Sequence, residues 1–140
     1  MTTLGVMKRL VTTIAVVLCL VGCGPSAGPL LTGDPLAGGA LAGGCFLAEG
    51  GGLLVFDPSY GTAIIGEGGT VDGRTIVAWR PGYTARANGS EFDVLDAQGR
   101  VVATTGQRYL LHGGYVDAGD VGRSDLEVVW WTCEDPEPLS

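Results

Sequence analysis

The chain has 140 residues, with 8 basic side chains, 15 acidic side chains and a formal net charge of −7. This length fits one globular domain. An acidic surface repels phosphate groups, which argues against a nucleic-acid partner and against electrostatic attachment to anionic lipid headgroups.

The first 22 residues have the pattern of an export signal. Lys8 and Arg9 form a positively charged start, and an apolar run follows over residues 10–21. That run is too short for a transmembrane helix, which needs about 20 apolar residues. Removing residues 1–22 would leave a chain without lysine. This absence, together with the abundance of Gly, Ala, Val, Arg and Asp, is typical of a high-GC bacterium.

The run Leu20-Val21-Gly22-Cys23 resembles the lipobox of bacterial lipoproteins. In that family the cysteine receives a lipid, and cleavage makes it the new N-terminus. The resemblance implies a lipoprotein signal peptide over residues 1–22 and acylation of Cys23, for example with palmitate. It also implies an anchor in the cell membrane or envelope on the extracytoplasmic side. The alternative is an ordinary secreted protein in which Cys23 only lies near the cleavage site.

Two cysteines remain for the mature domain. Cleavage would discard Cys19 and lipidation would use Cys23, which leaves Cys45 and Cys133. In an exported chain such a pair predicts a disulfide, and closing so long a loop stabilises the fold by about 4 kcal/mol in the chain-entropy model. Two separate buried thiols or a pair of metal ligands are the alternatives. The second is disfavoured because neither cysteine has a neighbouring His or Cys.

Four regions are expected along the chain: the signal peptide, a lipidated tether over residues 23–29, a β-barrel domain over 30–135 and a C-terminal tail over 136–140. Residues 24–44 are rich in Gly and Pro but contain four leucines. Because a solvated linker seldom carries so many leucines, we expect Leu30-Leu31-Thr32 to form a short first strand.

From Cys45 onward, short apolar runs alternate with Gly, Pro, Asn and Asp, which is typical of short strands and turns. The expected strands are residues 45–48, 53–56, 62–65, 75–79, 92–95, 100–104, 108–111 and 126–133. The expected turns are residues 49–52, 57–58, 66–69, 88–89 and 96–99, among which Asn88-Gly89 and Asp96-Ala97-Gln98-Gly99 are the strongest hairpin signals. No segment of the mature chain has a convincing helical period.

Short strands at this spacing predict an all-β fold. We expect a small closed or partly open β-barrel of the OB-like Greek-key type, because closing the sheet removes exposed edges. A Cys45–Cys133 bond would then join the first core strand to the last. An immunoglobulin-like β-sandwich is the alternative, although Trp79 only loosely fits the tryptophan expected between the cysteines of that fold.

A longer pattern supports this setting. It consists of residues 77–86 and 94–103, Gly106 and the run His112-Gly113-Gly114. This pattern resembles one in small exported actinobacterial proteins of unknown function. The likeness covers about residues 30–115. It implies a barrel in a bacterial envelope and carries no activity.

His112 is the only histidine, so any histidine-dependent acid–base chemistry must use it. His112-Gly113-Gly114 resembles the oxyanion loop of lipases and esterases, but no serine has the G-x-S-x-G setting that these enzymes need. We expect that the protein is not an enzyme. The alternative is a small envelope hydrolase with His112 as base and Asp117 as the carboxylate that orients it.

Asp117, Asp120 and Asp125 lie in one acidic segment before the last expected strand. Clustered carboxylates in flexible loops suit Ca²⁺, so these residues are weak candidates for a metal site and an acidic Ca²⁺-binding lipoprotein is a further alternative. Their spacing matches no EF-hand. We expect a solvated loop and no cofactor.

Aromatic residues are plentiful for so small a core. Because adjacent residues of a strand point to opposite faces, we expect one of Trp130 and Trp131 inside the barrel and the other at the surface or under a loop.

Trp79, Arg80, Tyr83 and Arg86 form a possible binding face for a sugar or a peptide, with packing under loops as the alternative. The favoured interpretation is a membrane-anchored envelope lipoprotein. Its barrel would bind or scaffold an unknown protein or cell-wall partner without catalysis.

Overall fold

The computed structural model describes residues 30–35, 48–66 and 73–140. The strands are β1 (Ala48–Asp57), β2 (Gly61–Ile65), β3 (Arg74–Ala78), β4 (Thr84–Asn88), β5 (Glu91–Leu95), β6 (Val101–Thr104), β7 (Arg108–Asp117), β8 (Val128–Thr132) and β9 (Glu137–Pro138). A 3-10 turn, η1 (Ala118–Val121), follows β7. Within these residues, no helix has the length and apolar character needed to cross a membrane.

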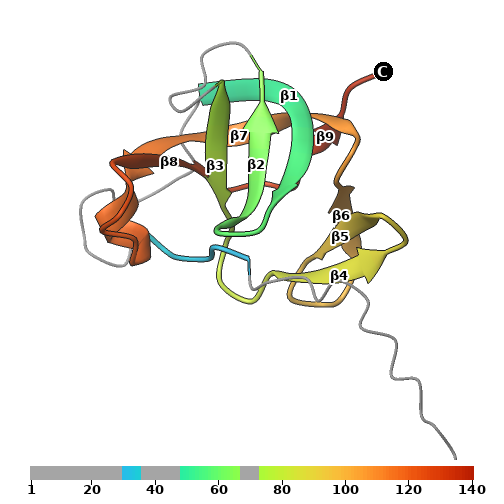
Figure 1. The fold of residues 1–140 in the computed structure, drawn as a ribbon, viewed down its shortest axis with the longest axis horizontal. Helices are drawn as coiled ribbons and strands as arrows, with labels where there is room; N and C mark the ends of the chain where they lie inside the picture. Colours follow the sequence, from blue (N-terminus) through green and yellow to red (C-terminus); the bar gives the residue numbers. More distant parts are fainter. Residues whose placement is uncertain (1–29, 36–47, 67–72) are drawn as a thin grey trace, which may run out of the picture.

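Five strands close into a barrel (Figure 1). Their order is β1-β2-β3-β8-β7, and β1 also pairs with β7. Neighbours are antiparallel except β3 and β8, which run parallel. The predicted all-β fold with a small OB-like barrel is confirmed, and the immunoglobulin-like sandwich is wrong.

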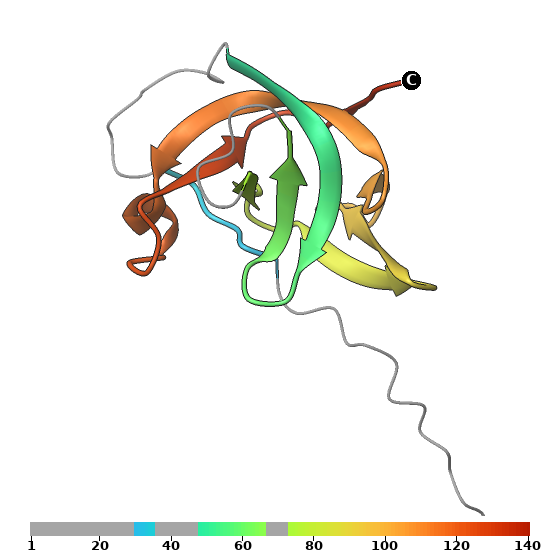
Figure 2. The same ribbon diagram turned by 45° about the horizontal axis from the view of Figure 1, so that its top comes forward.

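The barrel closes because β1 is long and bends (Figure 2). Ala48–Leu53 pairs with β7, and Leu53–Asp57 pairs with β2. The expected turn at residues 49–52 is wrong, since these residues continue the strand. The glycines there allow close packing: a Cβ on Gly52 would lie 2.3 Å from the carbonyl oxygen of Ile65.

The strands β4, β5 and β6 form a second sheet. In the sequence they lie between β3 and β7 of the barrel. Asn88 pairs with Glu91, so the tight turn consists of Gly89 and Ser90, one residue later than predicted. Gly89 has a φ of 64°, as expected at the first central position of a type I′ or II′ turn. The predicted Asp96–Gly99 turn is confirmed, with the Gly99 amide donating to the Asp96 carbonyl at 2.9 Å.

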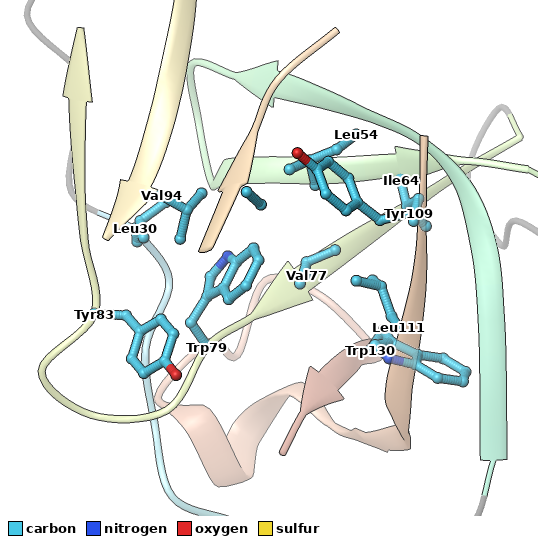
Figure 3. Close-up of a cluster of buried hydrophobic side chains, with 11 residues drawn as sticks. Leu30, Leu54, Ile64, Val77, Trp79, Tyr83, Val94, Tyr109, Leu111 and Trp130 are labelled. Carbon is cyan, nitrogen blue, oxygen red and sulfur yellow. The ribbon is translucent and has the colours of Figure 1, made fainter. Parts of the chain in front are cut away.

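The barrel interior is one hydrophobic cluster (Figure 3). Its buried members are Leu30, Leu54, Ile64, Val77, Trp79, Tyr83, Val94, Ala103, Tyr109, Leu111 and Trp130. Val94 and Ala103 come from β5 and β6. The second sheet therefore shares the barrel core and does not form a separate unit.

A second buried cluster lies on the opposite face of the same strands. Trp131 belongs to it, whereas Trp130 belongs to the first cluster, so the two indoles point to opposite faces as predicted. Both are buried, with exposed fractions of 4% and 5%. Val121 of η1 packs into the second cluster, and the Trp131 Nε1 donates to the Gly33 carbonyl at 3.0 Å. These two segments cover a face that would otherwise be apolar surface.

The two ends of the expected domain differ from the sequence expectation. Leu30-Leu31-Thr32 does not form a regular strand, and Thr32 makes a single parallel bridge with Trp79. At the other end, β9 lies within the expected tail and pairs with Tyr109 and Leu110 of β7. The C-terminal segment is therefore part of the fold.

Candidate functional site

A groove with a volume of about 290 Å³ lies where the turn after β3, the Asp96–Gly99 turn and the segment after β8 meet. Its polar lining includes Arg80, Tyr83, Asp96, Arg100 and Asp135, and we call it the arginine groove. The short turn after β3 places Tyr83 beside Arg80, because the Tyr83 amide donates to the Arg80 carbonyl at 3.3 Å.

Two donors meet on one carboxylate oxygen in this groove. The Arg80 Nη2 lies 2.7 Å from the Asp135 Oδ1, and the Tyr83 hydroxyl donates to the same oxygen at 2.6 Å. The Arg80 guanidinium also lies over the Tyr83 ring, 5.0 Å from its centroid. Burial, together with the hydrogen bond to Asp135, raises the pKa of Tyr83 to about 12. The phenol is therefore a protonated donor at neutral pH.

A second ion pair forms the opposite wall. One Asp96 oxygen accepts the amides of Gln98 and Arg100 at 2.9 Å, and the other accepts the Arg100 Nε at 2.7 Å. Burial alone would raise the pKa of Asp96, but the hydrogen bonds from Arg100 and Gln98 outweigh it and lower that pKa. Hydrogen bonding to Asp96, and the charges of Asp96 and Asp135, raise the pKa of Arg100. Asp96 is thus ionised and holds the guanidinium in place.

The aromatic rings of the possible binding face are buried, as in the packing alternative. Trp79 has an exposed fraction of 0% and stacks on Tyr83 with ring centroids 5.9 Å apart (Figure 3). Its Nε1 donates to the buried Thr62 Oγ1 at 2.8 Å. The large apolar indole is more stable in the core. Of the four residues of the possible binding face, Arg80 and Tyr83 line the groove.

Arg86 is also separate from the groove. It lies on β4, and its Nη2 bonds the Asp93 Oδ2 on β5 at 3.0 Å. This hydrogen bond, with those from Asn88 and Thr104, holds the pKa of Asp93 below its usual value although burial opposes the shift. Arg86 therefore stabilises the second sheet.

His112 lies between two glutamates. Its Nε2 is 3.1 Å from the Glu137 Oε1, and its Nδ1 is 3.9 Å from the Glu49 Oε1. Asp117 does not orient the ring, because its side chain accepts the Gly119 amide at 2.8 Å and caps η1. The His112–Asp117 pair of the hydrolase alternative is therefore not formed.

Gly113 also has a structural role. A Cβ at this position would lie 1.9 Å from the Trp131 carbonyl oxygen, so glycine is required for β7 to pair with β8. The resemblance of His112-Gly113-Gly114 to an oxyanion loop reflects strand packing.

The acidic segment does not gather into a metal site. Asp125 accepts the Arg123 Nε at 2.9 Å and the Tyr60 hydroxyl at 3.1 Å, while Asp117 caps η1. Among the residues that the structure describes, no group of three or more His, Cys, Asp or Glu side chains is placed to hold a metal ion. Asp120 lies in the first turn of η1.

The cysteine predictions concern residues mostly outside the described part. Cys23 and Cys45 both lie outside the described residues. Cys133 follows β8, is half-buried, and its amide donates to the His112 carbonyl at 3.0 Å. Lipidation and the disulfide stay predictions.

Three charged residues of the groove were not predicted as site residues: Asp96, Arg100 and Asp135. The turn signal at Asp96–Gly99 predicted the position of Asp96 but not its pairing with Arg100. Asp135 lies 55 residues from Arg80, and no local pattern brings two such distant side chains together.

Comparisons with protein-family models, curated proteins and solved structures found no match for this chain. Function is therefore inferred from its own residues.

Proposed function

We propose that the protein is a lipid-anchored envelope protein whose barrel domain binds a partner on the extracytoplasmic side of the membrane and catalyses no reaction. The observation that carries the anchor is Leu20-Val21-Gly22-Cys23 at the end of a basic and then apolar N-terminal segment. Acyl chains would supply the membrane affinity that an acidic surface lacks.

The arginine groove supports the binding role. Arg80, Tyr83, Asp96 and Arg100 are held by hydrogen bonds and ring contacts, so a partner would meet side chains that are already ordered. Ordered side chains lose less conformational entropy on binding than mobile ones. The fitting partner is a protein or a cell-wall component with polar groups.

The hydrolase alternative has weaker support. An activated nucleophile needs a base within hydrogen-bond reach, and that base needs an orienting group. In the described part of the chain, the carboxylates of Glu49 and Glu137 lie at the His112 ring nitrogens, and Asp117 is committed to η1. Either glutamate could orient the ring, but no hydroxyl nucleophile is among these described partners. A binding module therefore fits this arrangement better.

Replacing Cys23 with Ser tests the anchor. In an actinobacterial host, the full-length wild-type chain is expected in the membrane fraction. The Cys23→Ser variant is expected in a soluble or unprocessed form, because serine lacks the thiol that carries the lipid.

Cys19→Ser is the matched control, since Cys19 lies within the predicted signal peptide and should not affect fractionation. The anchor proposal fails if Cys23→Ser is processed and fractionates like the wild type.

A further inference from the structure

We propose that the arginine groove is a carboxylate-binding site, and that the Asp135 side chain occupies it as an internal ligand. The external ligand would be a carboxylate of a peptide, which is the same group that Asp135 presents to the groove from its own chain. This inference rests on the proposed binding function and names the ligand class. The Asp135 side chain would have to leave the groove before such a peptide binds.

The geometry around Asp135 is that of carboxylate recognition. A guanidinium and a hydroxyl both donate to its Oδ1, at 2.7 and 2.6 Å. Hydrogen bonds from charged donors to carboxylates are among the strongest in proteins, and arginine is the usual residue for this chemistry. Arg100 contributes a second positive charge on the other wall.

These donors are held by contacts that do not involve Asp135. Arg80 lies over the Tyr83 ring, and Tyr83 stacks on Trp79, which is itself fixed by Thr62. Across the groove, the almost fully buried carboxylate of Asp96 positions Arg100. The donors would therefore keep their places after Asp135 left.

The charge balance favours an anion. With Asp135 in place, Arg80 and Arg100 face Asp96 and Asp135, and the charges of these four residues cancel. Without Asp135 the groove has an excess positive charge in a chain whose net charge is −7. An anionic ligand would be attracted there and repelled by much of the remaining surface.

The Asp135 carboxylate can exchange with the carboxylate of an external ligand. The Asp135 side chain has an exposed fraction of 47%, and an exposed ion pair is weak because water competes for both partners. Beyond it, the two residues of β9 and the Leu139 amide, which donates to the Arg108 carbonyl at 2.9 Å, hold the segment around Asp135 on β7. The segment is also held by the Thr132 Oγ1, which donates to the Glu134 carbonyl at 2.9 Å, by the buried Pro136 and by the His112–Glu137 pair. The backbone can therefore stay in place while the Asp135 side chain rotates away from Arg80 and Tyr83.

The experiment uses the full chain and the probe N-acetyl-alanyl-alanine, with its C-terminal amide as the uncharged control. If Asp135 fills the groove nine-tenths of the time, Asp135→Ala should bind the carboxylate peptide about tenfold more tightly than the wild type. Glu134→Ala removes a neighbouring exposed carboxylate and should bind like the wild type. Adding Arg80→Gln to Asp135→Ala should abolish binding.

NMR titration gives the affinities and locates the site through the amide of Tyr83 and the indole of Trp79. A titration of the wild type should also shift the amides of Glu134, Asp135, Glu137 and Leu139, which provides a test that needs no substitution. Equal affinity of the wild type and Asp135→Ala would overturn the internal-ligand proposal. Equal affinity for the amide probe, or no shifts at the groove, would overturn the carboxylate site. None of these results bears on the membrane fractionation of Cys23→Ser, so the two proposals fail separately.

Discussion

Trp79 connects the barrel core to the arginine groove. Its indole is fully buried and donates to Thr62 at 2.8 Å, and its face stacks on Tyr83. The Tyr83 hydroxyl then bonds Asp135 at the surface. A rigid apolar stack thus positions a polar group at the edge of the fold, which is how a small core can order a binding site.

The raised pKa of Tyr83 predicts a loss of stability in alkali. Its pKa is about 12 in the folded protein, whereas an unfolded tyrosine titrates at about 10. The folded state therefore favours the protonated phenol. This contribution is complete below about pH 10 and is lost as the pH rises towards about 12.

Urea unfolding of the wild type and Tyr83→Phe between pH 8 and pH 12 measures this effect. The stability advantage of the wild type over Tyr83→Phe should shrink across that alkaline range. Tyr115→Phe is the control, because Tyr115 has an exposed fraction of 48%. Parallel pH profiles for the wild type and Tyr83→Phe would show that the tyrosine is not coupled to folding.

At the scale of single residues, the sequence predicts contacts between residues that are close together in the chain. Arg80 and Tyr83 were placed together because a Pro-Gly turn separates them by only three positions. The sequence leaves open whether Trp79 and Tyr83 are exposed or packed under loops, because alternation along a strand shows which residues share a face but not what covers that face.

At the scale of elements, the prediction of a turn at the three glycines of β1 is wrong. Glycine is common in turns because it adopts positive φ, but it also allows two backbones to approach closely. Gly50 faces the Trp130 ring, and Gly52 faces the backbone of Ile65. The reason for these glycines is long-range packing, which composition alone does not reveal.

Two neighbouring substitutions separate these roles. In Gly52→Ala the new Cβ would lie 2.3 Å from the Ile65 carbonyl oxygen, so β1 and β2 must shift. We expect a loss of about 1–3 kcal/mol in the free energy of unfolding. In Gly51→Ala the nearest atom is the Leu139 Cδ1 at 3.4 Å, at the end of a side chain, so the loss should be much smaller.

Thermal and urea unfolding of both variants provide the comparison. Equal destabilisation would mean that intrinsic glycine preference, and not close approach, determines the residue at position 52.

At the scale of the whole molecule, strand positions were largely predictable but strand partners were not. Apolar runs and turn residues located β2, β3, β5 and β6 almost to the residue. The parallel pairing of β3 with β8 and the addition of β9 to β7 join residues far apart in the sequence. Such pairings depend on how complete faces pack together, and a local pattern does not specify them.

The proposed Cys45–Cys133 disulfide also belongs to this scale. It would join the region before β1 to the end of β8 and restrict the unfolded chain. Cys133→Ala should lower the free energy of unfolding by ~2–4 kcal/mol and the melting temperature by several degrees.

Alkylation of the unreduced protein followed by mass spectrometry tests the bond itself. Two alkylated cysteines at positions 45 and 133 would refute the disulfide.

The mass of the N-terminal peptide, from protein extracted from host membranes, is the direct test of the lipid anchor. We expect a chain that begins at Cys23, lacks residues 1–22 and carries the mass of a diacylglycerol on that cysteine. A membrane-extracted chain that retains residues 1–22, or that begins at an unmodified Cys23, would contradict the lipid anchor.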